Sequence, residues 1–236
     1  MKNIKALLKL DYLLVAPYWL WFVLFFGISF ILGVFMNQGF AFMVSWTIFA
    51  GTIMAFPFEN TEKSNMNMLF AQLPTNRKSI VSARYMFIFI VLFLSLIIGI
   101  AGGLILDTIF SNSHAEMYYE FGINLSLFSL PMMLLSLSLS FGLYLLNVGF
   151  QTPFLYKVGY KKGKIFMWIP IIVVQAAMML PAILNLFNVE NPNRFNVFNI
   201  MIDNSTISTF IALGVGIVSA VLSYIFSRKI YLNKDV

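Results

Sequence analysis

Long apolar stretches separated by short polar intervals run along the chain from its N-terminus to its C-terminus. A helix needs about 20 mostly apolar residues to cross a bilayer, and several stretches reach that length. They are Leu13–Met36, Phe40–Phe58, Met86–Phe110, Gly122–Phe150, Ile165–Leu186 and Thr206–Ser227. The pattern predicts an all-α integral membrane protein with six transmembrane helices, forming a single transmembrane domain over residues 1–236.

The longest polar interval, Pro57–Tyr85, contains a short amphipathic pattern. Asn60 or Thr61 can cap the start of a helix, Glu62 suits the positive end of its dipole, and Pro74 ends it. The apolar side chains of this helix share one face, at spacings of i, i+3, i+4 and i+7. They are Met66, Leu69, Phe70 and Leu73.

A helix with such a face could lie on lipid or insert into a groove on a partner protein. Helices that bind lipid are typically rich in lysine, and this one carries only Lys63. The composition of the helix therefore favours a protein groove, with the lipid surface as the alternative.

Two further segments depart from the plain alternation of spans and loops. Met1–Leu10 sets apolar side chains against lysines and favours an N-terminal interfacial helix, the alternative being a frayed tail. In Leu180–Asn204, Pro181 and Pro192 leave two apolar pieces of about ten residues, too short to cross a bilayer. This favours an outer re-entrant hairpin between spans five and six, the alternative being a frayed helix end followed by a surface loop.

Small residues recur at helical spacing in two of the spans. Gly99 and Gly103 are four residues apart in the third, and Ala212, Gly216 and Ala220 form a similar stripe in the sixth. Such stripes let helix backbones approach closely. We expect them to serve packing within one subunit, with dimerisation as the alternative.

The composition excludes several classes of protein. Hydrophobic residues make up 60% of the chain and charged residues 10%, against about 25% charged in soluble domains, so nearly all of it belongs in a membrane. Cysteine is absent and His114 is the single histidine, which argues against a disulfide framework, a metal cluster and an imidazole relay.

The placement of Lys and Arg predicts the orientation. With the N-terminus inside, 14 of the 15 basic residues are cytoplasmic and only Arg194 is outside, so we expect both termini in the cytoplasm. The net charge of +6 then forms a belt against anionic lipid, and no nucleic-acid partner is needed. The predicted membrane-surface residues are Lys2, Lys5, Lys9, Arg77, Lys78 and Arg84.

Ionisable side chains are missing from the middle of the predicted spans, and Asp107 lies at the outer end of the third. Because such residues usually mark proton relays and ion pathways, their absence argues against a proton-driven antiporter and a selective ion channel. The string GYKKGKI from Gly159 lacks the glycine spacing and the Ser or Thr of a P-loop. We expect no catalytic site, no cofactor and no metal in this chain.

Two inner segments resemble a known family. The run ENTEKSNMNMLFAQLP into TNRKSIVSARY looks like the loop after the second span in membrane subunits of ABC-2 type transporters. The stretch TPFLYKVGYKKGKI from Thr152 is similar to the second inner loop of small bacterial members of that family. The resemblance covers most of the chain in layout but only these two stretches in residues.

The resemblance implies that Glu62–Leu73 is a coupling helix that docks onto an ATPase. Its docking residues would be Glu62, Lys63, Met66, Leu69, Phe70 and Leu73. The second cytoplasmic loop would contribute Pro153, Tyr156, Lys157, Gly159, Tyr160 and Lys161. An N-terminal interfacial helix and an outer re-entrant hairpin are also family features.

The implied function is that of a permease in the bacterial plasma membrane. It would pair with a second copy of itself or a homologous permease, and two cytoplasmic P-loop ATPase subunits would bind ATP and Mg²⁺. Closure of those subunits would push the coupling helix and tilt the second and third spans. The lack of a sizeable extracellular domain argues against large cargo such as cell-wall polymers.

The expected substrate is a hydrophobic small molecule or an amphipathic peptide, since no charged cavity is evident. The chain somewhat resembles membrane subunits of staphylococcal exporters of amphipathic peptide toxins, the phenol-soluble modulins, and extrusion of antibiotics or lantibiotics comes next. A non-transporting membrane scaffold, assembly factor or immunity protein is the alternative.

Overall fold

The computed structural model describes residues 2–35, 39–64, 77–110, 127, 129–163, 168–169, 172–173 and 204–233. These residues form helices and, within the described ranges, contain no β-strand. The helices are α1 (Lys2–Val15), the 3₁₀ turn η1 (Ala16–Tyr18), α2 (Trp19–Phe35), α3 (Gly39–Ile53), α4 (Phe56–Lys63), α6 (Arg77–Ile109), α8 (Leu130–Val158) and α11 (Ser205–Leu232). The all-α prediction is confirmed.

Among the described residues, five helical stretches are long and apolar enough to cross a membrane. They are Ile4–Val34, Gly39–Lys63, Arg77–Ile109, Leu130–Val158 and Ser205–Leu232. The expected span Ile165–Leu186 and the hairpin Leu180–Asn204 fall almost entirely outside the described residues. The chain is thus a multi-pass membrane protein, while six spans and the outer hairpin stay predictions.

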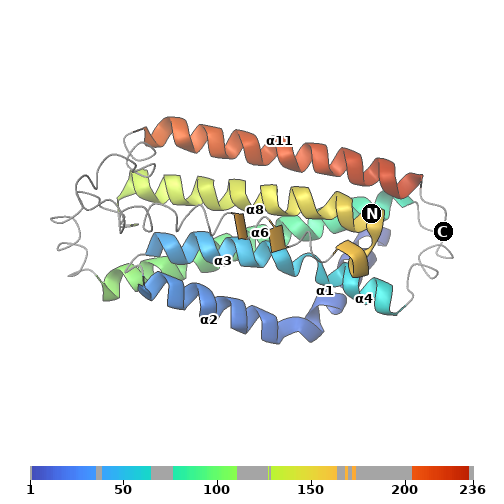
Figure 1. Ribbon diagram of the computed structural model, residues 1–236, viewed down its shortest axis with the longest axis horizontal. Coiled ribbons are helices and arrows are strands. Elements are labelled where there is room, and N and C mark those ends of the chain that lie inside the picture. The colour runs from blue at the N-terminus through green and yellow to red at the C-terminus, as the bar shows by residue number, and fades with distance from the viewer. Residues whose placement is uncertain are drawn as a thin grey trace.

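The long helices lie side by side along the length of the bundle (Figure 1). The start of α1 and the end of α11 are at the same end of it, together with α4 (Figure 1). That arrangement agrees with two termini on one side of the membrane, and which side they face stays a prediction.

Helix α3 is the centre of the bundle. Every residue from Gly39 to Ile53 is buried, and the helix is in contact with α2, α6 and α8. Its neighbours come close because glycines face one another: a Cβ added to Gly39 would lie 2.2 Å from the carbonyl oxygen of Gly103 on α6. Hydrophobic burial gives little drive between helices in lipid, so such close packing holds them together.

The second glycine stripe joins α8 and α11. A Cβ on Gly142 would lie 2.5 Å from the carbonyl oxygen of Ala212, and one on Gly216 would lie 2.8 Å from the Cα of Gly142. Gly99 and Gly103 face α3 in the same way. The prediction that these stripes serve packing within one subunit is confirmed.

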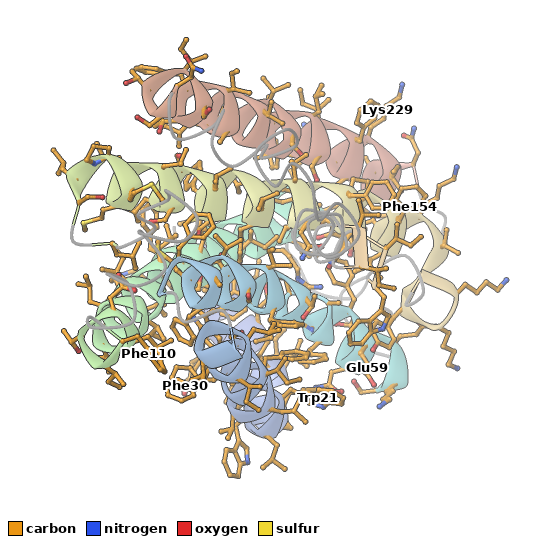
Figure 2. All side chains as sticks on the ribbon, turned by 60° about the vertical axis from the view of Figure 1, so that its left-hand side comes forward. Trp21, Phe30, Glu59, Phe110, Phe154 and Lys229 are labelled. Atoms are coloured by element: carbon orange, nitrogen blue, oxygen red, sulfur yellow. The ribbon has the colours of Figure 1, made fainter. Side chains whose placement is uncertain are left out.

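The outer faces of α2 and α11 are apolar and exposed. Trp21 and Phe30 stand out from α2 (Figure 2), and Phe210 on α11 is also exposed. A membrane protein presents such side chains to hydrocarbon, where they carry no penalty.

The N-terminal segment is a helix from Lys2 to Val15, in place of the frayed tail considered as the alternative. Pro17 lies in the 3₁₀ turn that separates α1 from α2. Because proline lacks an N–H and its ring crowds the preceding turn, it breaks the regular helix at this point. The first long helix therefore begins at Trp19, whereas the sequence predicts a span from Leu13.

Asp107 lies near the C-terminal end of α6, at the opposite end of this helix from Arg84. Its two carboxylate oxygens accept hydrogen bonds from the N–H of Gly39 (2.7 Å) and the N–H of Leu127 (2.5 Å). The side chain is fully buried. It joins the start of α3 and the approach to α8 to the end of α6, a structural role that the sequence did not indicate.

Candidate functional site

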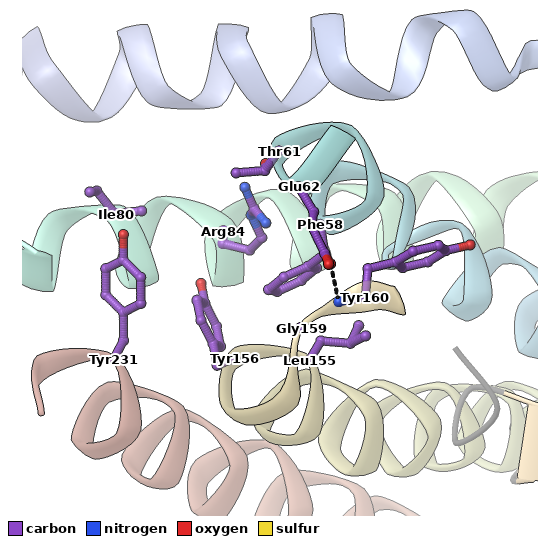
Figure 3. A pocket seen from close by; sticks show the side chains of 10 residues that line it. All are labelled: Phe58, Thr61, Glu62, Ile80, Arg84, Leu155, Tyr156, Gly159, Tyr160 and Tyr231. Carbon is purple, nitrogen blue, oxygen red and sulfur yellow. Dashed lines mark hydrogen bonds between the residues drawn. The ribbon is translucent and has the colours of Figure 1, made fainter. Parts of the chain in front are cut away.

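Residues from both predicted inner loops meet at the α4 end of the bundle. They line a small cavity of about 50 Å³ between α4, α6 and the ends of α8 and α11 (Figure 3). Its lining residues are Phe58, Thr61, Glu62, Ile80, Arg84, Leu155, Tyr156, Gly159, Tyr160 and Tyr231. The structure thus brings Glu62 of the first predicted segment together with Tyr156, Gly159 and Tyr160 of the second.

Helix α4 begins earlier than the sequence predicts. Pro57 is in its first turn, where a missing N–H costs nothing, and the helix ends at Lys63. Asn60 and Thr61 therefore lie inside α4, and the prediction that they cap a helix start is wrong. Met66, Leu69, Phe70 and Leu73 lie outside the described residues, so the amphipathic coupling helix stays a prediction.

Asn60 fastens α4 to the N-terminal segment instead of capping a helix. Its side-chain amide donates to the carbonyl oxygen of Leu14 (2.6 Å), and its side-chain oxygen accepts from the hydroxyl of Tyr18 (3.0 Å). The ring of Tyr18 stacks on Phe56 at 4.3 Å between centroids. These contacts hold the end of α1 and the turn η1 against α4.

Glu62 links α4 to the segment that follows α8. Its Oε2 accepts a hydrogen bond from the backbone N–H of Tyr160 (2.6 Å), which is drawn in Figure 3. It accepts a second from the backbone N–H of Lys161 (3.1 Å). These are the first N–H groups of a helical turn that continues to Gly163. A carboxylate in this position acts as a cap contributed by a distant part of the chain.

Gly159 makes this geometry accessible to the chain. Its N–H bonds to the carbonyl oxygen of Leu155 (3.1 Å) and ends α8, and its φ of 80° is in the region that favours glycine. A Cβ at this position would also lie 3.2 Å from Oε2 of Glu62. Only glycine combines the turn with this close approach of the carboxylate.

The second predicted loop is mostly helix. Because α8 continues to Val158, Pro153, Tyr156 and Lys157 belong to α8, and the loop begins at Gly159. Tyr160 is half-buried, and its pKa is raised above the ordinary value, first by burial of the phenol and then by the nearby Glu59 carboxylate. The phenol is therefore neutral at physiological pH.

Arg84 is buried, with 4% of its surface exposed, so its assignment to the headgroup region is wrong. Its Nη2 and Nε donate to the two carboxylate oxygens of Asp11, at 2.8 and 3.3 Å. The guanidinium also lies 4.4 Å from the ring centre of Phe58. Helix α1 covers this face of α6, and its Asp11 is the counter-ion of Arg84. The prediction from the placement of Lys and Arg took no account of acidic partners.

The other predicted membrane-surface residues differ among themselves. Lys5, Lys9 and Lys78 are exposed, and Arg77 is half-buried. The side chain of Lys2 is outside the described part. Contact of these residues with headgroups stays a prediction.

Aromatic and hydroxyl side chains connect α11 to the same cluster. The ring of Tyr156 packs against Phe58 (4.9 Å between centroids) and Tyr231 (5.2 Å). The hydroxyl of Tyr85 pairs with Ser223 (2.6 Å) and Ser227 (3.0 Å) on α11. The sequence contains no signal for these pairs beyond the presence of polar residues in apolar helices.

The cluster is a junction of helices. Within the described ranges, no group of three or more His, Asp or Glu side chains could hold a metal ion. Its charged groups contact backbone N–H groups or each other. What the arrangement can do is carry a displacement of α4 to α1, α6, α8 and α11.

Comparison with known proteins gives one match. A family model described as ABC-2 family transporter protein matches residues 6–232. Neither the curated proteins nor the solved structures contain a match to the chain.

Proposed function

The chain belongs to the ABC-2 transporter family, and from that premise we propose that it is the export permease of a transporter driven by a separate cytoplasmic ATPase. Membership makes it the membrane component of an ABC transporter, a multi-pass protein of the cell membrane. In the proposal it pairs with a second copy or a homologous permease. ATP and Mg²⁺ are bound by the ATPase, and this chain contributes no catalytic group.

The observation that carries the docking proposal is the junction at Glu62. Two segments about a hundred residues apart in sequence share a carboxylate that binds two backbone N–H groups. A partner that presses on α4 or on the residues after it would act on α8 directly and on α6 through the neighbouring Arg84 and Phe58. One contact surface would then move most of the bundle.

The substrate proposal is supported by the surface of the bundle. A groove of about 660 Å³ between α2, α3 and α6 is lined by aromatic residues such as Trp19, Phe26 and Phe87. A second groove, of about 740 Å³, lies between α8 and α11. Neither groove is lined by a charged side chain in the described part of the chain, which suits a hydrophobic molecule or the apolar face of an amphipathic peptide.

The test is affinity purification of the tagged chain from bacterial membranes in mild detergent. We expect a P-loop ATPase to be purified with it, and cells that express both to resist an added amphipathic peptide toxin. Leu69→Asp and Phe70→Asp should lose the ATPase and the resistance, because a charge on the apolar face opposes insertion into a groove.

Asn67→Asp is the matched control, since it adds the same charge on the other side of the predicted helix. It should keep both properties. Retention of the ATPase and of resistance in Leu69→Asp and Phe70→Asp would overturn the docking assignment. A wild-type chain that carries no ATPase would indicate a scaffold or immunity protein.

A further inference from the structure

Helices α8 and α11 form a unit of their own beside the central helix α3. They pack along their length through close approaches, with Gly142 against Ala212 and Gly149 against Ser219. Helix α4, in contrast, follows directly from α3 after two turn residues, Met54 and Ala55. A displacement of α4 therefore reaches α3 through the chain itself, while α8 and α11 must receive it through side chains.

Two of the contacts from α4 to the α8 side are made by Phe58 and Glu62. The Phe58 ring meets Tyr156 edge to face, which is an apolar contact that can slide. The Glu62 carboxylate binds the N–H groups of Tyr160 and Lys161, which fixes both direction and distance. Of these two contacts, the hydrogen-bonded one transmits a pull as well as a push.

The turn that Glu62 holds is the start of a helical segment, where the first backbone N–H groups have no partner within the helix. The described part of this segment is Tyr160–Gly163, and the N–H groups of Tyr160 and Lys161 find their acceptor in the Glu62 carboxylate. Its internal bond runs from the N–H of Gly163 to the carbonyl oxygen of Gly159 (3.0 Å). The position of the turn relative to α4 therefore depends on the carboxylate.

We propose that Glu62 is the positioning residue that transmits movement of α4 to the α8–α11 unit, by capping the turn Tyr160–Gly163. The source of that movement rests on the proposed function, in which an ATPase presses on this end of the bundle. Gly159 is the hinge about which the turn follows α4, because its backbone is in the left-handed region between α8 and the turn. Loss of the cap uncouples ATP hydrolysis from transport while leaving the helices folded.

The neighbouring Glu59 provides a matched control. It lies on α4 one turn before Glu62 and is paired with the exposed Lys63 on the same helix. Removal of its carboxylate takes the same charge from the same helix and removes its contact with the Tyr160 phenol, but it leaves the backbone N–H groups of Tyr160 and Lys161 bonded to Glu62. Any general effect of lost charge on α4 appears in both variants, and an effect of the cap appears only at Glu62.

The first measurement needs only the full chain in detergent. The protein has no cysteine, so spin labels can be placed at Ser64→Cys and Lys162→Cys, both exposed positions, and their separation measured by EPR. We expect one narrow distance with Glu62 and with Glu59→Ala, and a broad distribution with Glu62→Ala. Glu62→Gln keeps one acceptor oxygen and should fall between them, which also serves if Glu62→Ala folds poorly.

The second measurement uses the complex with the ATPase. In the complex that forms, the amount of substrate transported per ATP hydrolysed should be on the order of tenfold lower for Glu62→Ala than for Glu59→Ala, the scale expected for charge-assisted hydrogen bonds. Equal label distances and equal transport in Glu62→Ala and Glu59→Ala would overturn the inference. If wild-type protein carries no ATPase, the proposed function fails, whereas the EPR result still decides whether Glu62 positions the turn.

Discussion

The two ends of α6 each bury an ionisable side chain, and the contacts described for the two side chains differ in kind. Near the α4 end, the cation Arg84 is paired with the carboxylate of Asp11 and covered by the ring of Phe58. At the other end, the carboxylate of Asp107 accepts hydrogen bonds from the backbone N–H groups of Gly39 and Leu127. An ion pair fastens one end of the helix, and hydrogen bonds from two backbone N–H groups contribute at the other end.

The difference shows that the chemistry of each side chain and its neighbours determines which partners it needs when buried. A buried guanidinium carries five donors and no acceptor, so it needs an anion from another element. A carboxylate can be satisfied by donors at the start of a helix, where N–H groups lack partners and the dipole is positive. The glycines at the Asp107 end let the backbone come near enough, while aromatic side chains fill the Arg84 end.

The largest effect is expected from Arg84→Ala, which leaves Asp11 buried and uncompensated. Loss of one partner of a buried pair costs about 3–5 kcal/mol, so the variant should unfold at a much lower temperature in detergent. The double variant Asp11→Leu, Arg84→Met removes both charges and should recover most of the loss. A single variant as stable as wild type would show that the pair is not buried in the membrane.

Next comes Asp107→Ala, which leaves the N–H groups of Gly39 and Leu127 without their carboxylate. Each hydrogen bond to a charged group contributes about 1.5 kcal/mol or more, so we expect a loss of about 3 kcal/mol in unfolding by SDS titration. Asp107→Asn keeps one acceptor and should lose about half as much. An Asp107→Asn variant as unstable as Asp107→Ala would mean that charge alone matters at this end.

A smaller loss should follow Gly39→Ala, which tests whether the Asp107 end depends on close backbone approach. The added Cβ would meet the Gly103 carbonyl oxygen at 2.2 Å and the Asp107 carboxylate at 2.6 Å. Overpacking of this kind costs about 1–3 kcal/mol in thermal unfolding. Gly214→Ala is the control, because nothing lies within 4 Å of its Cβ, and it should be neutral or slightly stabilising.

The smallest effect is expected from Lys63→Ala. Its ion pair with Glu59 lies at the surface, with 63% of the lysine side chain exposed. Solvent screens such a pair, so no measurable change in the unfolding temperature should result. A clear fall in the unfolding temperature would contradict the view that the large effects expected at Arg84 and Asp107 arise because those side chains are buried.

The sequence predicted the helical class and most of the described spans, because hydropathy over some 20 residues is a local property. Pro17 and Pro57 also carry local information, and the starts of α2 and α4 follow from them, although the predicted boundaries lie elsewhere. Gly159 could be recognised as a helix end on the same grounds, since glycine often follows the last turn.

The contacts of the candidate site could not be predicted in this way. Asp11 and Arg84 are 73 residues apart, and Glu62 is nearly a hundred residues from the N–H groups that it caps. Nothing in a single sequence identifies such pairs. Asp11 is an acidic residue among apolar residues and lysines, which hints at a cationic partner but does not identify Arg84.

The spacing of Asp107 and Arg84 has a mechanical consequence. They are 23 residues apart on one continuous helix, which corresponds to roughly 35 Å, close to the thickness of the hydrocarbon core. A rigid rod fastened near both membrane faces behaves as a lever pivoting inside the bilayer. A tilt of roughly 10° about its midpoint would carry the two fastened points about 3 Å in opposite directions, so that a push at one face of the membrane becomes a shift of the loops at the other.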